Sequence, residues 1–128
     1  MNNTVYPCIW CDNNAHEMAG FYCSTFPETT VVDENPVVIV LEMFGQKLML
    51  LDGGDKFNPN PSISLMFLTM SEKQVEEIWN KLIQNGKSMM PLDAYPFSPK
   101  YGWVQDKYGV SWQLYTARDE NHILRKIV

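Results

Sequence analysis

The chain has 128 residues, of which 45% are hydrophobic and 20% charged, and its formal net charge is −5. This composition is typical of one globular domain and excludes a disordered chain. The ten basic residues are scattered, which argues against nucleic-acid binding because that needs clustered Lys and Arg. No apolar run approaches a membrane span, and no export signal is visible near Met1. We therefore expect a cytoplasmic protein without a nucleic-acid or membrane partner.

The first half of the chain predicts a strand, a helix and three more strands. A strand over residues 4–11 precedes a helix over residues 15–25, and Asp12, Asn13 and Asn14 are all good N-cap residues for it. Pro27 ends the helix because its ring cannot continue the hydrogen-bonded turns. Strands are expected over residues 29–32, 36–44 and 46–51, with a turn at Gly45 between the last two.

A linker and a second set of elements follow. Residues 52–61 contain two Gly, two Pro and two Asn, which is typical of a linker. After a strand over residues 62–69, Ser71 and Gln74 form a capping box for a helix over residues 72–85. A strand over residues 88–92, a Pro-rich loop over residues 93–100, and a hairpin of residues 101–106 and 110–115 complete the half. The turn of this hairpin lies at residues 107–109.

The two halves repeat one order of elements. Phe44–Gly45 aligns with Tyr108–Gly109, which places Leu48 on Trp112 and Met49 on Gln113. The repeat predicts an α+β fold of two paired βαβββ modules, about residues 1–56 and 57–117, within a single domain. The tail, residues 118–128, has apolar side chains that one module pair would leave uncovered, so we expect a homodimer.

Strand parity separates the two faces of the last strand. Val110, Trp112 and Leu114 point one way and suit packing under a helix, whereas the alternate residues point the other way. The alternate residues, which suit the lining of a ligand site, are Ser111, Gln113 and Tyr115.

The three cysteines are Cys8, Cys11 and Cys23, a low and odd number that fits reduced thiols. Cys8 and Cys11 have CxxC spacing, but in a strand such residues point to opposite faces. A zinc or redox role is therefore not expected for this pair.

Three segments carry a resemblance: PCIWCDNNAHEMAGFYCSTFP, LMLLDGG and SPKYGWVQDKYGVSWQL. With the element order they resemble the PhnB-like branch of the vicinal oxygen chelate superfamily, also called the glyoxalase, bleomycin-resistance and extradiol dioxygenase superfamily. The resemblance implies a curved mixed sheet around a cleft. Members of this branch are often labelled 3-demethylubiquinone 3-methyltransferase-like. We do not expect methyl transfer, because Gly53–Gly54 precedes no predicted helix that could bind a methyl donor.

In metal-dependent members of this superfamily, four cleft side chains hold one divalent ion. The matching positions fall at Tyr6 or Pro7, Met49, Ser64 and Gln113. Of these only Gln113 offers a ligand, and a divalent ion needs several carboxylates or imidazoles. We expect no metal and no other cofactor.

The expected site is a cleft that holds an unidentified small molecule. Its predicted lining is Tyr6, Met49, Leu51, Ser64, Met66, Gln113 and Tyr115, with Tyr95, Phe97 and Trp103 as a candidate lid. Tyr95 and Phe97 lie between prolines, where either a partner subunit or a ligand would cover them.

No catalytic residue is identified, since no nucleophile or general base falls on the predicted cleft face. Binding without chemistry is the main hypothesis. The alternatives are a lyase, isomerase or oxygenase-type enzyme using the same cleft, and a scaffold whose collapsed cleft satisfies Gln113 internally.

Overall fold

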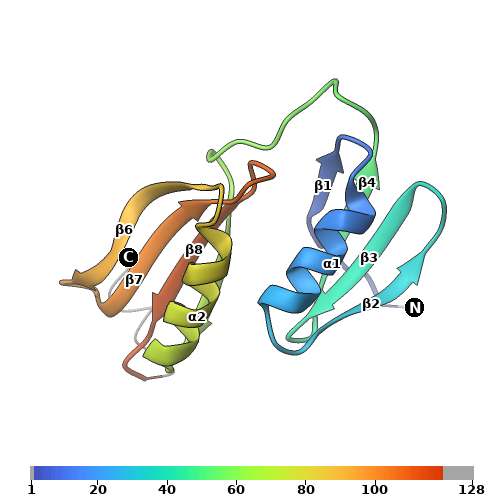
Figure 1. The fold of residues 1–128 in the computed structure, drawn as a ribbon. Coiled ribbons are helices and arrows are strands. Elements are labelled where there is room, and N and C mark those ends of the chain that lie inside the picture. Colours follow the sequence, from blue (N-terminus) through green and yellow to red (C-terminus); the bar gives the residue numbers. More distant parts are fainter. Residues whose placement is uncertain (1, 120–128) are drawn as a thin grey trace. The chain divides into compact units, whose positions relative to one another are not determined.

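The computed structural model describes residues 2–119. The chain divides into two compact units, module 1 (Met1–Pro59) and module 2 (Asn60–Val128). Each module has the order βαβββ, as the repeat predicted (Figure 1). The fold is therefore α+β, with two four-stranded mixed sheets. That both modules form one domain stays a prediction.

Module 1 contains β1 (Cys8–Cys11), α1 (Ala15–Thr25), β2 (Thr29–Glu34), β3 (Val38–Met43) and β4 (Gln46–Asp52). Its strands lie in the order β1-β4-β3-β2, and β1 runs parallel to β4. Module 2 contains β5 (Ser64–Thr69), α2 (Glu72–Leu82), β6 (Lys87–Tyr95), β7 (Ser98–Gln105) and β8 (Ser111–Thr116). Its order, β5-β8-β7-β6, is equivalent, with β5 parallel to β8.

The turns that match in sequence also match in backbone conformation. Gly45 precedes β4 with φ +83°, and Gly109 precedes β8 with φ +87°. Glycine adopts such left-handed angles without the steric cost that a Cβ brings. The hairpin of β7 and β8 turns at residues 107–109, as predicted.

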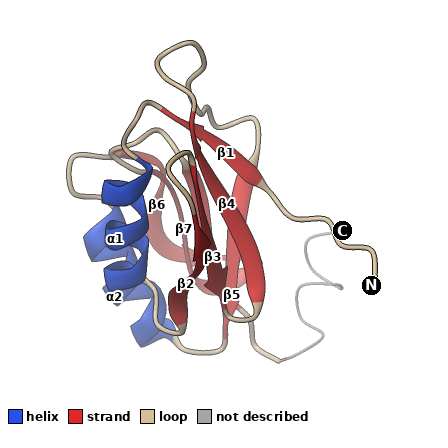
Figure 2. Cartoon of the chain, turned by 90° about the vertical axis from the view of Figure 1, so that its right-hand side faces the viewer, coloured by secondary structure: helices blue, strands red, loops and turns tan. Residues whose placement is uncertain are grey.

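Each helix covers one face of its own sheet (Figure 2). In module 1 the helix contributes buried Met18, Ala19 and Tyr22, which recur at the spacing of one helix face. The facing strand residues are fully or nearly buried and comprise Ile39, Leu41, Leu48 and Leu50. Burial of such apolar surface is the main stabilising term of the module.

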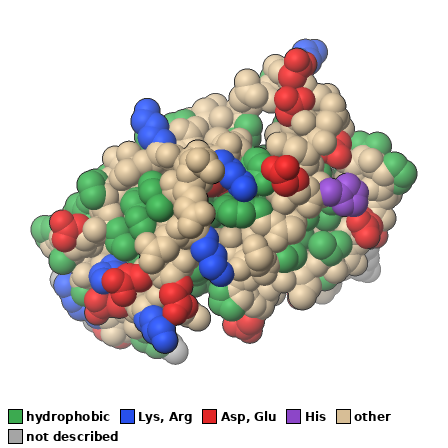
Figure 3. Space-filling model, viewed as in Figure 1, with side chains coloured by type: hydrophobic (Ala, Val, Ile, Leu, Met, Phe, Trp, Pro, Cys, Tyr) green, Lys and Arg blue, Asp and Glu red, His purple; other side chains and the backbone are tan. Residues whose placement is uncertain are grey.

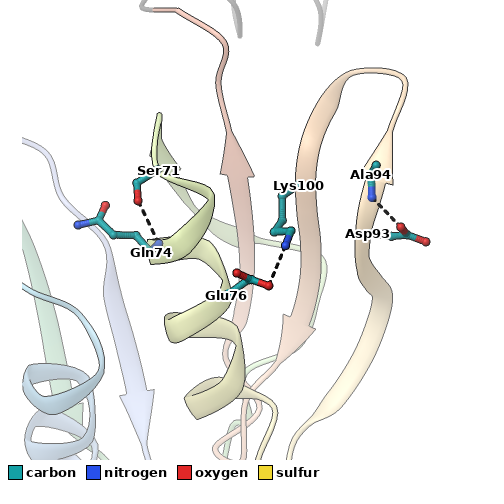
Figure 4. A network of polar contacts seen from close by, with 6 residues as sticks. All are labelled: Ser71, Gln74, Glu76, Asp93, Ala94 and Lys100. Carbon is teal, nitrogen blue, oxygen red and sulfur yellow. Dashed lines mark hydrogen bonds and ion pairs between the residues drawn. The ribbon is translucent and has the colours of Figure 1, made fainter.

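The second helix is fixed to its sheet by packing and by polar contacts. Its buried stripe is Val75, Ile78, Trp79 and Leu82. The Trp79 indole lies so close to Gly102 that a Cβ there would be 2.6 Å from it. Ser71 Oγ accepts the Gln74 backbone N–H at 3.1 Å, and Lys100 pairs with Glu76 at 2.8 Å (Figure 4). The Ser71 cap is thus confirmed, but the reciprocal half of the predicted capping box is not, because the Ser71 backbone N–H donates to Thr69 Oγ1, and Gln74 Oε1 accepts from the Thr69 hydroxyl.

Several predicted boundaries are wrong. The first strand begins at Cys8 rather than residue 4, and α2 ends at Leu82 rather than residue 85. The largest error is residues 93–100, which are mostly strand, because β6 runs to Tyr95 and β7 starts at Ser98. The pairing of β6 with β7 is irregular between Ser88 and Tyr95, a segment that contains Pro91. Such irregularities let a strand accommodate a proline, which has no N–H to donate. Most of the predicted tail lies outside the described residues.

Candidate functional site

The face of the module 2 sheet opposite α2 carries most of the polar groups of interest. We call it the open face of module 2. Strand register places on it Ser64, Met66 and Leu68 of β5, Tyr101 and Trp103 of β7, and Ser111, Gln113 and Tyr115 of β8. Parity therefore divides β8 as the sequence predicted.

Gln113 lies at the centre of this open face. Its neighbours across the sheet are Met66 on β5 and Trp103 on β7. The hydroxyl of Tyr101 donates to Gln113 Oε1 at 2.6 Å. This bond orients the amide, and no acceptor for Gln113 Nε2 is found among residues 2–119. The amide therefore presents two N–H donors.

A second polar group lies two residues before Gln113 on β8. Ser111 Oγ accepts the indole N–H of Trp103 at 2.7 Å and lies 2.6 Å from Ser64 Oγ. The two hydroxyls hold two protons, but their mutual bond uses only one. Ser111 is buried and Ser64 is half-buried, so this pair also presents a donor.

An aromatic cluster lies at one end of the open face. Phe97 stacks on Tyr115 with ring centroids 5.8 Å apart and meets Tyr101 edge-on at 5.0 Å. Tyr95 stacks on Phe97 at 5.4 Å. Burial, and secondarily the nearby Tyr95, raise the pKa of Tyr101 to about 12. Tyr101 is therefore a neutral hydroxyl donor at physiological pH.

The face of the module 1 sheet opposite α1 is more apolar. Register places Cys8 beside Met49 and Trp10 beside Leu51. The Trp10 indole donates to Gly54 O at 2.8 Å and packs edge-on against Phe57 at 5.0 Å. This face offers contact area with few polar groups.

The two cysteines of the CxxC spacing lie on opposite faces, as predicted. Cys8 is exposed, whereas Cys11 is buried on the helix side. Burial raises the pKa of Cys11 to about 11, so its thiol stays protonated and unreactive.

The predicted site residues divide between the modules. Tyr6, Met49 and Leu51 belong to module 1, and the Tyr6 ring lies 5.9 Å from Lys47 Nζ. The module 2 residues share the open face, but Tyr115 is fully buried and its hydroxyl donates to Phe97 O at 2.6 Å. Tyr115 therefore has no exposed surface to give a ligand.

Two residues of the candidate lid, Tyr95 and Phe97, were predicted in a loop over residues 93–100, and most of that segment is strand instead. Tyr95 ends β6, and Phe97 lies in the short turn before β7. Trp103 lies within β7, opposite Gln113. The sequence placed Ser111 on the face that suits a ligand site but named neither Ser111 nor Tyr101 in the predicted lining or lid. The register of the β7–β8 hairpin supplies the signal, because it pairs Tyr101 with Tyr115 and Gln105 with Ser111.

Metal-binding chemistry has little support in the residues present. Within residues 2–119, no three His, Cys, Asp or Glu side chains gather closely enough to hold an ion. The positions matched to the ligands of metal-dependent relatives carry Tyr6 or Pro7, Met49, Ser64 and Gln113. Thioether, hydroxyl and amide groups fit a tight divalent site poorly.

Comparison with known proteins gives a consistent result. A family model described as 3-demethylubiquinone-9 3-methyltransferase matches residues 3–115. A PhnB protein from Bacillus cereus is 31% identical over 88% of this chain and 98% of its own, with a TM-score of 0.81. No curated protein matches the chain.

More distant structures share the fold. The fosfomycin resistance protein FosX from Listeria monocytogenes is 11% identical, with a TM-score of 0.70 and 98% of each chain covered. A glyoxalase-related enzyme from Fulvimarina pelagi is 20% identical, with a TM-score of 0.61, over 89% of this chain and 88% of its own. At these identities the likeness concerns architecture alone.

Proposed function

Because the chain belongs to the family described as 3-demethylubiquinone-9 3-methyltransferase, in the PhnB-like branch of the vicinal oxygen chelate superfamily, we propose that it binds a small molecule. The binding surface is the open face of module 2. The protein works there without the metal ligands that are usual in the superfamily.

One observation carries this proposal. Gln113 presents a fixed amide, held by Tyr101, in the middle of an apolar surface formed by Met66 and Trp103. Small-molecule sites are mainly apolar surfaces with a few oriented polar groups. Gln113 is half-buried, so its Nε2 protons remain available to a ligand or to water.

The family description names a methyltransferase, but the fold does not favour methyl transfer here. Gly53 and Gly54 lead into residues 55–63, which contain no helix, and then into β5. Methyl-donor sites commonly use a glycine turn between a parallel strand and a helix. Both sheets of the described residues are mixed four-stranded sheets instead.

We also propose a cytoplasmic homodimer. All three cysteines are free thiols, which suits a reducing compartment. Neither helix in the described residues has the length and apolarity to cross a membrane. The edge strand β5 exposes Met66 and Leu68, and Ile63 and Met70 beside it are 78% and 65% exposed. A second copy would cover this apolar edge.

Native mass spectrometry of the purified protein tests the binding proposal. We expect a bound mass that is lost in Gln113→Leu and retained in Gln46→Leu, a control at the exposed start of β4. If Gln113→Leu raises stability and leaves ligand affinity unchanged, the open face is not the site. Chemical conversion of the bound compound would instead support the alternative of a lyase, isomerase or oxygenase-type enzyme.

A further inference from the structure

The polar groups of the open face have one property in common. Gln113 Oε1 is already used by the Tyr101 hydroxyl, so the amide offers its Nε2 protons. The Ser64–Ser111 pair has one hydroxyl proton beyond their mutual bond, because Ser111 also accepts the Trp103 N–H. Both groups therefore offer donors to a ligand.

The spacing of these donors suits one ligand. Ser111 and Gln113 are two residues apart on one strand, which separates their Cα atoms by about 7 Å. Trp103 lies next to both donor groups, because it is opposite Gln113 on the neighbouring strand and its indole N–H donates to Ser111. A planar molecule against the Trp103 and Met66 side chains would reach either donor.

The charge around the donors selects among acceptors. The strand positions next to Gln113 on this face carry no Lys or Arg; they are Ser64, Met66, Leu68, Tyr101, Trp103, Ser111 and Tyr115. Gln105 lies beside Ser111, and the more distant strand β6 adds one charge of each sign, Lys87 beside Gln105 and Asp93 beside Tyr101. The charge of Arg118 acts on Tyr115 from beyond the end of β8. Lys100 points to the helix side, where it pairs with Glu76 (Figure 4). The formal net charge of −5 adds a repulsive field for anions. An uncharged oxygen acceptor fits this surface better than a carboxylate or phosphate.

We propose that the open face of module 2 recognises an uncharged carbonyl oxygen on an apolar, aromatic body, through the Nε2 protons of Gln113 and the free hydroxyl proton of the Ser64–Ser111 pair. This rests on the proposed function and adds the chemical class of the ligand. Tyr101 is a positioning residue here, because it bonds to the amide oxygen and leaves the amide nitrogen for the ligand.

Acetophenone is the probe. Ethylbenzene is the matched compound without a carbonyl, and benzoate is the matched compound with a negative charge. The full chain, labelled with ¹⁵N, is titrated and followed by NMR at the Gln113 side-chain amide and the Trp103 indole N–H. We expect acetophenone to move both signals saturably, with benzoate and ethylbenzene each binding about tenfold more weakly, which is ~1.4 kcal/mol.

Gln113→Glu is the informative variant. Its carboxylate still accepts from Tyr101 but has no N–H, so acetophenone affinity should fall about tenfold or more. Gln74→Glu is the matched control, because Gln74 Oε1 likewise accepts a hydroxyl, that of Thr69 at 2.8 Å, but on α2. This control should bind acetophenone like the unmodified chain.

Each other outcome has a defined meaning. Equal binding of ethylbenzene would overturn the carbonyl class and leave small-molecule binding intact. Tighter binding of benzoate would show an anion site instead. Unchanged acetophenone binding by Gln113→Glu would also overturn the proposal. So would a protein that holds another ligand in native mass spectrometry but does not bind acetophenone. A protein that binds nothing in either experiment would contradict the proposed function itself.

Discussion

Asp106 organises the turn that places β8 beside β7. The side chain is buried, and its Oδ1 accepts the backbone N–H groups of Tyr108 and Val110. Its Oδ2 accepts the Trp112 indole N–H at 2.9 Å. Asp106 therefore joins the backbone of the turn to a core tryptophan.

We predict that Asp106→Asn lowers the free energy of unfolding by roughly 2–3 kcal/mol, because an amide N–H would face the Trp112 N–H. Urea denaturation measures this change. Asp93→Asn is the control, since Asp93 is exposed and accepts only the Ala94 N–H, as Figure 4 shows. Equal, small effects at both positions would contradict the prediction.

Tyr101 has a pKa that its burial, and then the nearby Tyr95, raise from 10.0 to about 12. The folded chain therefore holds the phenolic proton more tightly than the unfolded chain does. This contribution to stability is fully present below pH 10.0 and is lost as the pH rises through about 12.

We predict that Tyr101→Phe is less stable than the unmodified chain at pH 8, because it lacks the hydrogen bond to Gln113. The difference should shrink by roughly 2–3 kcal/mol on going to strongly alkaline pH. Denaturant titrations of both proteins at a series of pH values measure it. A difference that stays constant with pH would count against the assigned pKa.

At the scale of elements, α1 is capped by a distant strand. Asn14 is its N-cap residue, but the Asn14 side chain makes no capping bond. Asp52, at the end of β4, accepts the Ala15 backbone N–H through Oδ1 at 2.9 Å. A carboxylate at a helix N-terminus also interacts favourably with the helix dipole.

We predict that Asp52→Ala lowers the free energy of unfolding by about 1 kcal/mol, the typical value of an N-cap bond. Asp55→Ala removes an equal charge from the exposed linker and should change stability by less than about 0.5 kcal/mol. Thermal denaturation followed by circular dichroism compares the two. If Asn14→Ala is more damaging than Asp52→Ala, the N-cap residue itself provides the cap instead.

At the scale of the whole molecule, charge is dispersed. On the face shown in Figure 3, Lys and Arg side chains are interspersed with Asp and Glu. On that face the described residues form no extended basic surface, in agreement with the net charge of −5.

We predict a homodimer, held partly by the apolar edge of β5. Sedimentation at micromolar concentration should give a species of twice 14.8 kDa. Leu68→Lys should shift the equilibrium to monomer, because Leu68 is 42% exposed on that edge, whereas Val5→Lys, 94% exposed outside any strand, should not. Only the single-chain mass for the unmodified protein would refute this.

We predict that the dialysed protein holds less than one equivalent of Zn, Ni, Mn or Fe. Structural metal sites owe roughly 10–16 kcal/mol to a complete ligand set, and Met49 and Ser64 offer only a thioether and a hydroxyl at two of the four positions that the resemblance matches to metal ligands. Elemental analysis after dialysis decides the matter. One retained equivalent of any of these metals would contradict the prediction.

The sequence by itself determined the fold class and the faces of the strands. Both follow from local rules: Ser71 and Gln74 fix the start of a helix, and the period of two along β8 separates Gln113 from Trp112. The match between Gly45 and Gly109 also predicted that the two modules are equivalent, and the equivalent strand orders of the two sheets confirm this.

Only the tertiary structure decided which groups meet. Pro96 and Pro99 favour a loop in any local analysis, but pairing between β6 and β7 makes most of residues 93–100 strand. The same pairing brings Tyr101 to Gln113 and Phe97 over Tyr115, which buries one predicted site residue and orients another. Such contacts depend on register and on side-chain packing between strands distant in sequence, and no local pattern encodes them.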